Sequence, residues 1–230
     1  MKNIFHSIED KFFQRSTIRQ WMWVSCSFSM VLLVLRIITS GRLSYGFLAW
    51  NLFLAFVPYF ISSWLSNHAE MLKSRLRLSA LIFLWMLFMP NSFYILTDLF
   101  HLQNLDNGHP WFDLLLIFSF AWNGILFGIL SIQKMEMILK NGKGKLVSGF
   151  VIAVVMWLNA FGVYIGRMLH FNSWDIFTNP FDLISDIANM FLAPYYYRYV
   201  WVMSLCFAFF MIIIYYTIKK SAEFFAGIRN

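Results

Sequence analysis

The stretch WFDLLLIFSFAWNGILFGILSI, Trp111–Ile132, decides the fold class, because Asp113 is the one charged residue in it. A helix of about 20 mostly apolar residues crosses the roughly 30 Å hydrocarbon layer of a membrane. Lipid offers the backbone no hydrogen-bond partner, so such a stretch is expected to be helical. Five further runs share this character, namely Trp21–Thr39, Leu43–Ser66, Leu76–Leu99, Leu146–Leu169 and Tyr197–Ile218. The sequence predicts an all-α integral membrane protein, a bundle of six transmembrane helices.

The composition excludes an ordinary soluble domain, since 60% of the 230 residues are hydrophobic and 13% are charged. We expect a single membrane domain, residues 1–230, whose partner is the lipid bilayer. The net charge of +7 does not indicate nucleic acid, because no soluble domain carries it. The first apolar run lacks a cleavage pattern and is expected to remain as a span. Cys26 and Cys206 lie inside predicted spans and suggest no disulfide.

The lysines orient the predicted bundle. All nine lie in one of four segments: before span one, between spans two and three, between spans four and five, or after span six. The positive-inside rule therefore places both termini in the cytoplasm. The opposite side receives Arg36, Arg42, Arg167 and Arg198 together with most of the aspartates. No ionisable residue is expected deep in the cytoplasmic half of any span.

Two segments outside the spans are predicted to be helical. Residues 1–20 place apolar residues at helical intervals beside basic ones, which is typical of an amphipathic helix on the membrane surface. The loop before span six contains an amphipathic stretch over residues 180–192, with Pro180 as its first residue and Thr178 or Asn179 as its cap. We expect this second stretch to be an interfacial helix on the outer face.

Small residues recur at helical spacing in spans four and five, as Gly124-x-x-x-Gly128 and Gly162-x-x-x-Gly166. This pattern lets helix backbones approach closely. We interpret it as packing between neighbouring spans of one chain, with a homodimer face as the less favoured alternative.

The segment MPNSFYILTDLFHL, residues 89–102, is the richest in candidate functional residues. On an α-helix Asn91, Tyr94, Asp98 and His101 share one face. Such a stripe is costly against lipid and should face the bundle or a wet cavity. It is either a polar seam that fixes helix register or part of a functional site. Buried asparagines at 51, 123 and 159 are expected to meet it below the outer mouth.

The segment GVYIGRMLHFNSWD, residues 162–175, supplies the second candidate group. A guanidinium group matches carboxylate or phosphate. The arginines therefore either pair with Asp98, Asp113 and Asp175 or hold an anionic ligand. We favour pairing for Arg36 and ligand binding for Arg167. The candidate catalytic residues are Asp98, His101, Asp113 and Asp175, and the candidate substrate-binding residues are Asn91, Tyr94, Arg167 and Asn172.

No metal or cofactor is assigned from the sequence. Asp98-x-x-His101 and His109 are weak candidates for a metal site, because nitrogen and oxygen ligands suit zinc or manganese. The chain contains no HExxH motif, no GxSxG motif and no P-loop.

Several of these motifs, in this order, resemble a bacterial family of polytopic membrane proteins catalogued as domain of unknown function 1361. The resemblance rests on Asn51-Leu52 with Pro58, Pro90-Asn91, Thr97-Asp98-Leu99 with His101-Leu102, Trp111-Phe112-Asp113, Gly166-Arg167 and Asn172-Ser173-Trp174-Asp175. It implies a multi-pass protein of the bacterial cytoplasmic (inner) membrane and supplies no activity.

Three classes of function remain open at this point. The first is a membrane enzyme that acts on a lipid-linked or anionic substrate at the outer mouth, with Asp98 and His101 as acid and base. The second is a small-solute or ion-coupled transporter, for which the breaks at Pro58 and Pro90 are the relevant features. The third is a non-catalytic assembly or envelope-maintenance protein. The oligomeric state is left open.

Overall fold

The computed structural model describes residues 2–68, 70–71, 74–104, 110–140 and 145–228, without the side chains of 2–17, 101, 103–104, 139–140, 145–146, 148 and 226–228. This part of the chain is helical and contains no strand. Its elements are α1 (Lys2–Ser40), α2 (Phe47–Asn67), α3 (Arg75–Tyr94), the 3-10 helix η2 (Ile95–Asn104), α4 (Pro110–Lys140), α5 (Lys145–Met168), α6 (Asp175–Thr178), α7 (Pro180–Leu192) and α8 (Arg198–Ile228).

Within these ranges six helices are long and apolar enough to cross a membrane: α1, α2, α3 with the start of η2, α4, α5 and α8. The predicted all-α bundle of six transmembrane helices is confirmed. In the most apolar 18-residue stretch of α4, 67% of the residues are buried, against 22% in the corresponding stretches of α1 and α8. α4 is therefore the central helix, and α1 and α8 lie at the periphery.

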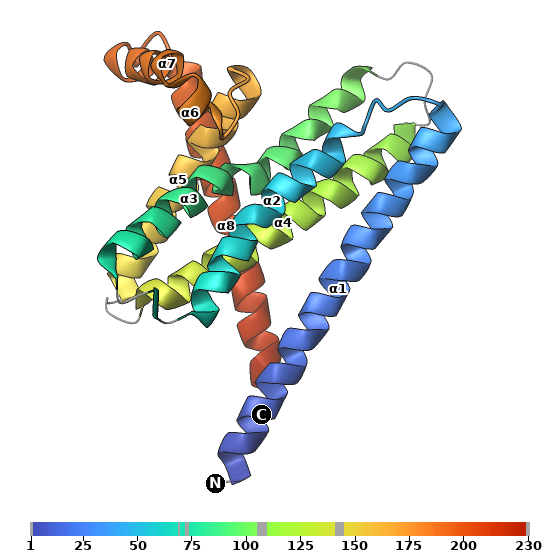
Figure 1. The fold of residues 1–230 in the computed structure, drawn as a ribbon, viewed down its shortest axis with the longest axis vertical. Coiled ribbons are helices and arrows are strands. Elements are labelled where there is room, and N and C mark those ends of the chain that lie inside the picture. Colours follow the sequence, from blue (N-terminus) through green and yellow to red (C-terminus); the bar gives the residue numbers. More distant parts are fainter. Residues whose placement is uncertain (1, 69, 72–73, 105–109, 141–144, 229–230) are drawn as a thin grey trace.

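The spans alternate in direction, so each end of the bundle gathers its own residues (Figure 1). The last turn of α2 and the first of α3 lie near the end of α4 and the start of α5. We call this the lysine end, because Lys134 and Lys219 lie there. The other end holds Asp98, Asp113 and Asp175 and is called the aspartate end. α6 and α7 connect α5 to α8 along the chain and lie beside the start of α8, at the aspartate end.

The N-terminal helix differs from the predicted arrangement. α1 runs without interruption from Lys2 to Ser40, so residues 2–20 do not form a separate helix before the first span. The physical reason is that this segment contains neither glycine nor proline. Nothing in the backbone breaks the helix where the polar segment meets the apolar one.

α3 is packed between two glycine faces, one from α4 and one from α5. A Cβ atom on Gly124 would lie 2.7 Å from the carbonyl oxygen of Ser92, and one on Gly162 would lie 2.5 Å from Cγ of Pro90. Gly128 approaches Phe93, and Gly166 approaches Tyr94, in the same way. The prediction that both glycine motifs pack neighbouring spans of one chain is confirmed.

Beyond Tyr94 the chain tightens into a 3-10 helix, which has about 3.0 residues per turn in place of 3.6. The predicted stripe of Asn91, Tyr94, Asp98 and His101 assumed one α-helix, whereas the helix type changes after Tyr94. Asp98 contacts Asn51 of α2 and Arg167 of α5, and the side chain of His101 lies outside the described residues. Thr97 supports the tightened turn, since its hydroxyl donates to the carbonyl oxygen of Tyr94 at 2.6 Å.

A buried ion pair at the lysine end was not predicted from the sequence. α4 continues to Lys140, so Glu136 lies inside its span and is 7% exposed. Lys219 of α8 donates to Glu136 Oε1 at 2.8 Å, and the hydroxyl of Tyr215 donates to the same carboxylate. The ion pair ties the end of α8 to α4.

Candidate functional site

A cavity of about 460 Å³ runs along α3, between α2 and α5. Loop residues 171–173 and side chains of α6 and α7 complete its lining at the aspartate end. This volume lies within the range of about 300–1,000 Å³ that is usual for small-molecule sites. The cavity is therefore the principal candidate for a ligand-binding site in the described part of the chain.

The polar residues of the lining gather toward the aspartate end. They are Asn51 of α2, Asn91 and Tyr94 of α3, and Asn172 and Ser173 of the following loop. Asn91 Nδ2 donates to Ser173 Oγ at 2.8 Å, which fastens the loop to α3. Of the sequence-predicted binding residues, Asn91, Tyr94 and Asn172 line the cavity, whereas Arg167 is not part of the lining.

The remainder of the cavity is apolar and reaches toward the middle of the bundle. Phe83 lies about 16 Å from Tyr94 along α3, at 1.5 Å per residue. Met86 and Leu87 of α3 and Leu158 of α5 line the same region. Phe83 and Leu158 are 54% and 38% exposed, so the cavity meets the molecular surface at this depth. In a spanning helix that surface faces hydrocarbon.

A buried carboxylate lies next to the polar end of the cavity. Asp98 is 1% exposed, accepts a hydrogen bond from Asn51 Nδ2 at 2.9 Å, and pairs with Arg167 Nη1 at 3.3 Å. Asn51 touches both the cavity and the carboxylate. The guanidinium group of Arg167 also lies 6.0 Å from the ring centre of Tyr94. The Asp98–Arg167 pair is thus separated from the cavity by a single layer of side chains.

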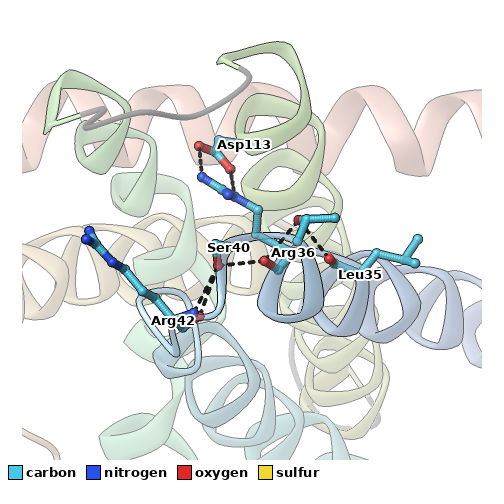
Figure 2. Close-up of polar contacts among 6 residues, drawn as sticks. Leu35, Arg36, Ser40, Arg42 and Asp113 are labelled. Carbon is cyan, nitrogen blue, oxygen red and sulfur yellow. Dashed lines mark hydrogen bonds and ion pairs between the residues drawn. The ribbon is translucent and has the colours of Figure 1, made fainter.

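The second aspartate of the spans belongs to another ion pair. Asp113 at the start of α4 is fully buried and is held by Arg36 of α1, with Arg36 Nη2 at 3.0 Å from Asp113 Oδ2. Figure 2 shows the guanidinium of Arg36 directed at this carboxylate, whereas the side chain of Arg42 points away from it. The pairing that the sequence favoured for Arg36 is confirmed. Asp113 therefore fastens α1 and does not join Asp98.

Asp175 has a local role in the turn that leads into α6. Its Oδ2 accepts from the backbone N–H of Asn172 at 2.6 Å, and its Oδ1 accepts from the Thr178 hydroxyl at 2.8 Å. These donors hold the pKa of Asp175 below its usual range. The two hydrogen bonds shape the loop that presents Asn172 and Ser173.

The histidines contribute little to the described site. The side chain of His101 and the whole of His109 lie outside the described residues. His170 follows the end of α5 in the left-handed backbone region, at φ 62°, and is exposed. No group of three or more His, Cys, Asp or Glu side chains that could hold a metal ion occurs among the described residues.

The three asparagines that the sequence places below the outer mouth share no hydrogen bond with one another in the described part of the chain. Asn51 contacts Asp98, and Asn123 Nδ2 donates to Ser29 Oγ of α1 at 2.9 Å. Asn159 is fully buried, and its amide has no hydrogen-bond partner in the described part of the chain. Sequence reasoning missed Ser173 as the partner of Asn91 and Glu136 as a buried carboxylate. No feature of a single sequence would have shown either contact.

Comparison with known proteins identifies a family. The family described as a protein of unknown function (DUF1361) matches residues 50–214. No curated protein and no solved structure matches the chain. The matched segment begins in α2 and ends in α8, so it contains the cavity and the Asp98–Arg167 pair. Because the match covers well over half of its length, this multi-span membrane protein belongs to the DUF1361 family.

Proposed function

We propose that this protein binds a lipid-linked, amphipathic molecule in the cavity beside α3. One observation carries the proposal: the cavity is apolar toward the middle of the bundle, polar at the aspartate end, and borders the hydrocarbon-facing surface. A ligand with an alkyl chain and a polar head group would place the chain in the apolar part of the cavity and the head group in the polar part. We further propose that the membrane is the bacterial cytoplasmic membrane, with the lysine end inside and the aspartate end outside.

The head group must supply the selectivity. An alkyl chain that leaves the bilayer for an apolar cavity exchanges one apolar environment for another and gains little free energy. The hydrogen bonds that a head group can form with Asn51, Asn91 and Ser173 have no counterpart in the hydrocarbon of the bilayer. They therefore determine which lipid-linked molecule binds.

Asp98 favours a second candidate function, an enzyme that acts on the bound head group. A buried carboxylate within a span marks a functional site more often than a structural one. Asp98 lies one hydrogen bond from Asn51, which lines the cavity. The transporter interpretation has less support, because the polar lining residues of the described chain gather at one end.

Photocross-linking tests the binding function. The protein in nanodiscs receives lipids with a diazirine in the acyl chain, and cross-linked peptides are identified by mass spectrometry. We expect cross-links to the α3 segment containing Phe83 and Met86. Leu158→Trp should fill the cavity and reduce them, whereas Leu205→Trp on the exposed face of α8 should not. Equal labelling in both variants would refute the proposal.

The enzyme interpretation has its own measurement. Lipids that copurify with the wild type and with Asp98→Asn are compared by mass spectrometry after incubation in nanodiscs. An enzyme converts its lipid in the wild type and leaves it unchanged in the variant. If both proteins retain the same lipid species in the same amounts, binding without chemistry is the function.

A further inference from the structure

We infer that the head group selected by this cavity is uncharged and rich in hydroxyl groups, as in a glycosyl or polyol lipid. The inference rests on the proposed binding function and names the class of its ligand. It follows from which atoms at the polar end of the cavity are already occupied and which are not.

The amide of Asn51 offers an acceptor to the cavity. Its Nδ2 donates to Asp98, and Asp98 can only accept there because it is paired with Arg167. This partner fixes which amide atom is nitrogen. No hydrogen bond from the described residues reaches Asn51 Oδ1. A carbonyl oxygen with free lone pairs therefore remains for a ligand.

Asn91 has the same orientation for the same reason. Its Nδ2 donates to the carbonyl oxygen of Phe88 at 3.0 Å and to Ser173 Oγ at 2.8 Å. A backbone carbonyl cannot donate, so the oxygen of this amide is the atom without a partner in the described part of the molecule. Asn172 repeats the pattern, with Nδ2 directed at the Asp175 carboxylate at 3.4 Å.

Three amides at one end of the cavity thus offer acceptors. A phosphate or carboxylate head group would present its own acceptor oxygens to these amide oxygens and would leave the amide oxygens unsatisfied. Hydroxyl groups donate to such oxygens. Hydroxyl groups of a ligand can also accept hydrogen bonds from the hydroxyl groups of Ser173 and Tyr94, which line the same cavity.

The charges around the cavity agree with an uncharged head group. No charged side chain belongs to the lining formed by the described residues. Two carboxylates contact lining residues from outside the lining: Asp98, which Arg167 balances at 3.3 Å, and Asp175, whose Oδ2 accepts from the backbone N–H of Asn172 at 2.6 Å. A charged head group placed here would lose its hydration without finding an opposite charge in the lining itself. Arg167 is therefore a partner of Asp98 and does not select an anion.

A comparison of three single-chain probes tests the inference. Dodecyl maltoside, dodecyl phosphate and dodecylamine share one alkyl chain and differ in head group. Each is titrated, radiolabelled, into nanodiscs containing the full-length protein, and bound probe is corrected for uptake by empty nanodiscs. We expect dodecyl maltoside to bind tightest. Its affinity should exceed that of dodecyl phosphate by about tenfold, the difference that one or two additional hydrogen bonds produce.

Variants assign the preference to the amides. Asn91→Leu should weaken maltoside binding about three- to tenfold and leave phosphate binding unchanged. Asn172→Ala tests the same idea at an exposed loop position if the first variant does not fold. Asn189→Leu, on the exposed side of α7, is the matched control and should change neither affinity.

Each result has a defined meaning. If the phosphate or the amine binds as tightly as the maltoside, the inference about the head group is wrong and the binding function stands. If no probe binds the wild type better than it binds Leu158→Trp, the proposed function itself fails.

Discussion

At the scale of single residues, Asp98 links three helices. It lies on η2 and is held by Asn51 from α2 and by Arg167 from α5. A carboxylate in this position is stable only while both partners remain, because a buried charge without a partner is costly. The polar end of the cavity therefore depends on the integrity of this group.

Substitutions of Asp98 and Arg167 should have non-additive effects on the stability of the protein. We expect Asp98→Leu or Arg167→Leu alone to lower the free energy of unfolding by about 3–5 kcal/mol, since each leaves an unpaired charge. The double variant should lose less than the sum of the two. Steric-trapping measurements in bicelles supply the free energies.

The exposed pair Lys220–Glu223 is the control for that cycle. Its side chains are 71% and 53% exposed, so water screens their attraction. Replacement of either residue by alanine should change the stability by no more than about 0.5 kcal/mol. An additive result for Asp98 and Arg167 would show that their contact contributes nothing.

The Asp175 turn should show a defined dependence on pH. Hydrogen bonds lower the pKa of Asp175 in the folded protein. Its contribution to stability is therefore fully present above the unfolded pKa of about 3.9 and is lost as the pH falls through the lower folded value. The difference in melting temperature between the wild type and Asp175→Asn should be constant above about pH 5 and shrink below about pH 4.

The matched control for this pH series is Asp186→Asn in α7, because no hydrogen bond from the described residues reaches the Asp186 carboxylate. The melting-temperature difference for this variant should stay nearly constant over the same range. A shrinking difference of equal size in both variants would contradict a specific role for the Asp175 turn.

At the scale of helices, the close approach of α5 to α3 depends on Gly162. A methyl group there would lie 2.5 Å from Pro90, and neither backbone can yield easily. We expect Gly162→Ala to destabilise the protein by about 1–3 kcal/mol. Chemical denaturation followed by circular dichroism measures the change.

Gly149 lies on the same helix and provides the comparison. A Cβ atom there meets nothing closer than the Tyr216 hydroxyl at 3.9 Å. Gly149→Ala should therefore stabilise α5 by up to about 1 kcal/mol, the difference in helix propensity. The packing account is wrong if the two alanine variants have the same stability.

The helices themselves could be predicted because apolar length alone determines a membrane span. The contacts between them could not. Asp98 and Asp113 look equivalent in the sequence, yet one faces Arg167 and the other Arg36. The sequence of residues 95–104 also gives no sign of the change from α-helix to 3-10 helix after Tyr94. Glu136 was overlooked because it stands among lysines and suggests a solvated loop.

At the scale of the whole molecule, cysteine labelling tests the proposed orientation of the bundle in the membrane. Single cysteines are introduced at Asn189 in α7 and at Lys220 in α8, in a chain whose Cys26 and Cys206 are replaced by alanine. A membrane-impermeant maleimide should label the first site in intact spheroplasts. It should label the second only after permeabilisation. The reverse pattern would overturn the proposed topology.

The pairing of Arg36 with Asp113 determines when α1 can join the bundle. Among the other helices α1 packs mainly against α4, and the two paired residues are 77 positions apart in the chain. At a synthesis rate of about 5–20 residues per second, Arg36 emerges roughly 4–15 s before its partner. During that interval its long side chain must reach toward the lipid head groups. The first helix made therefore stays unfastened until the fourth span, α4, has been synthesised, while α2 and α3 can already pack against each other.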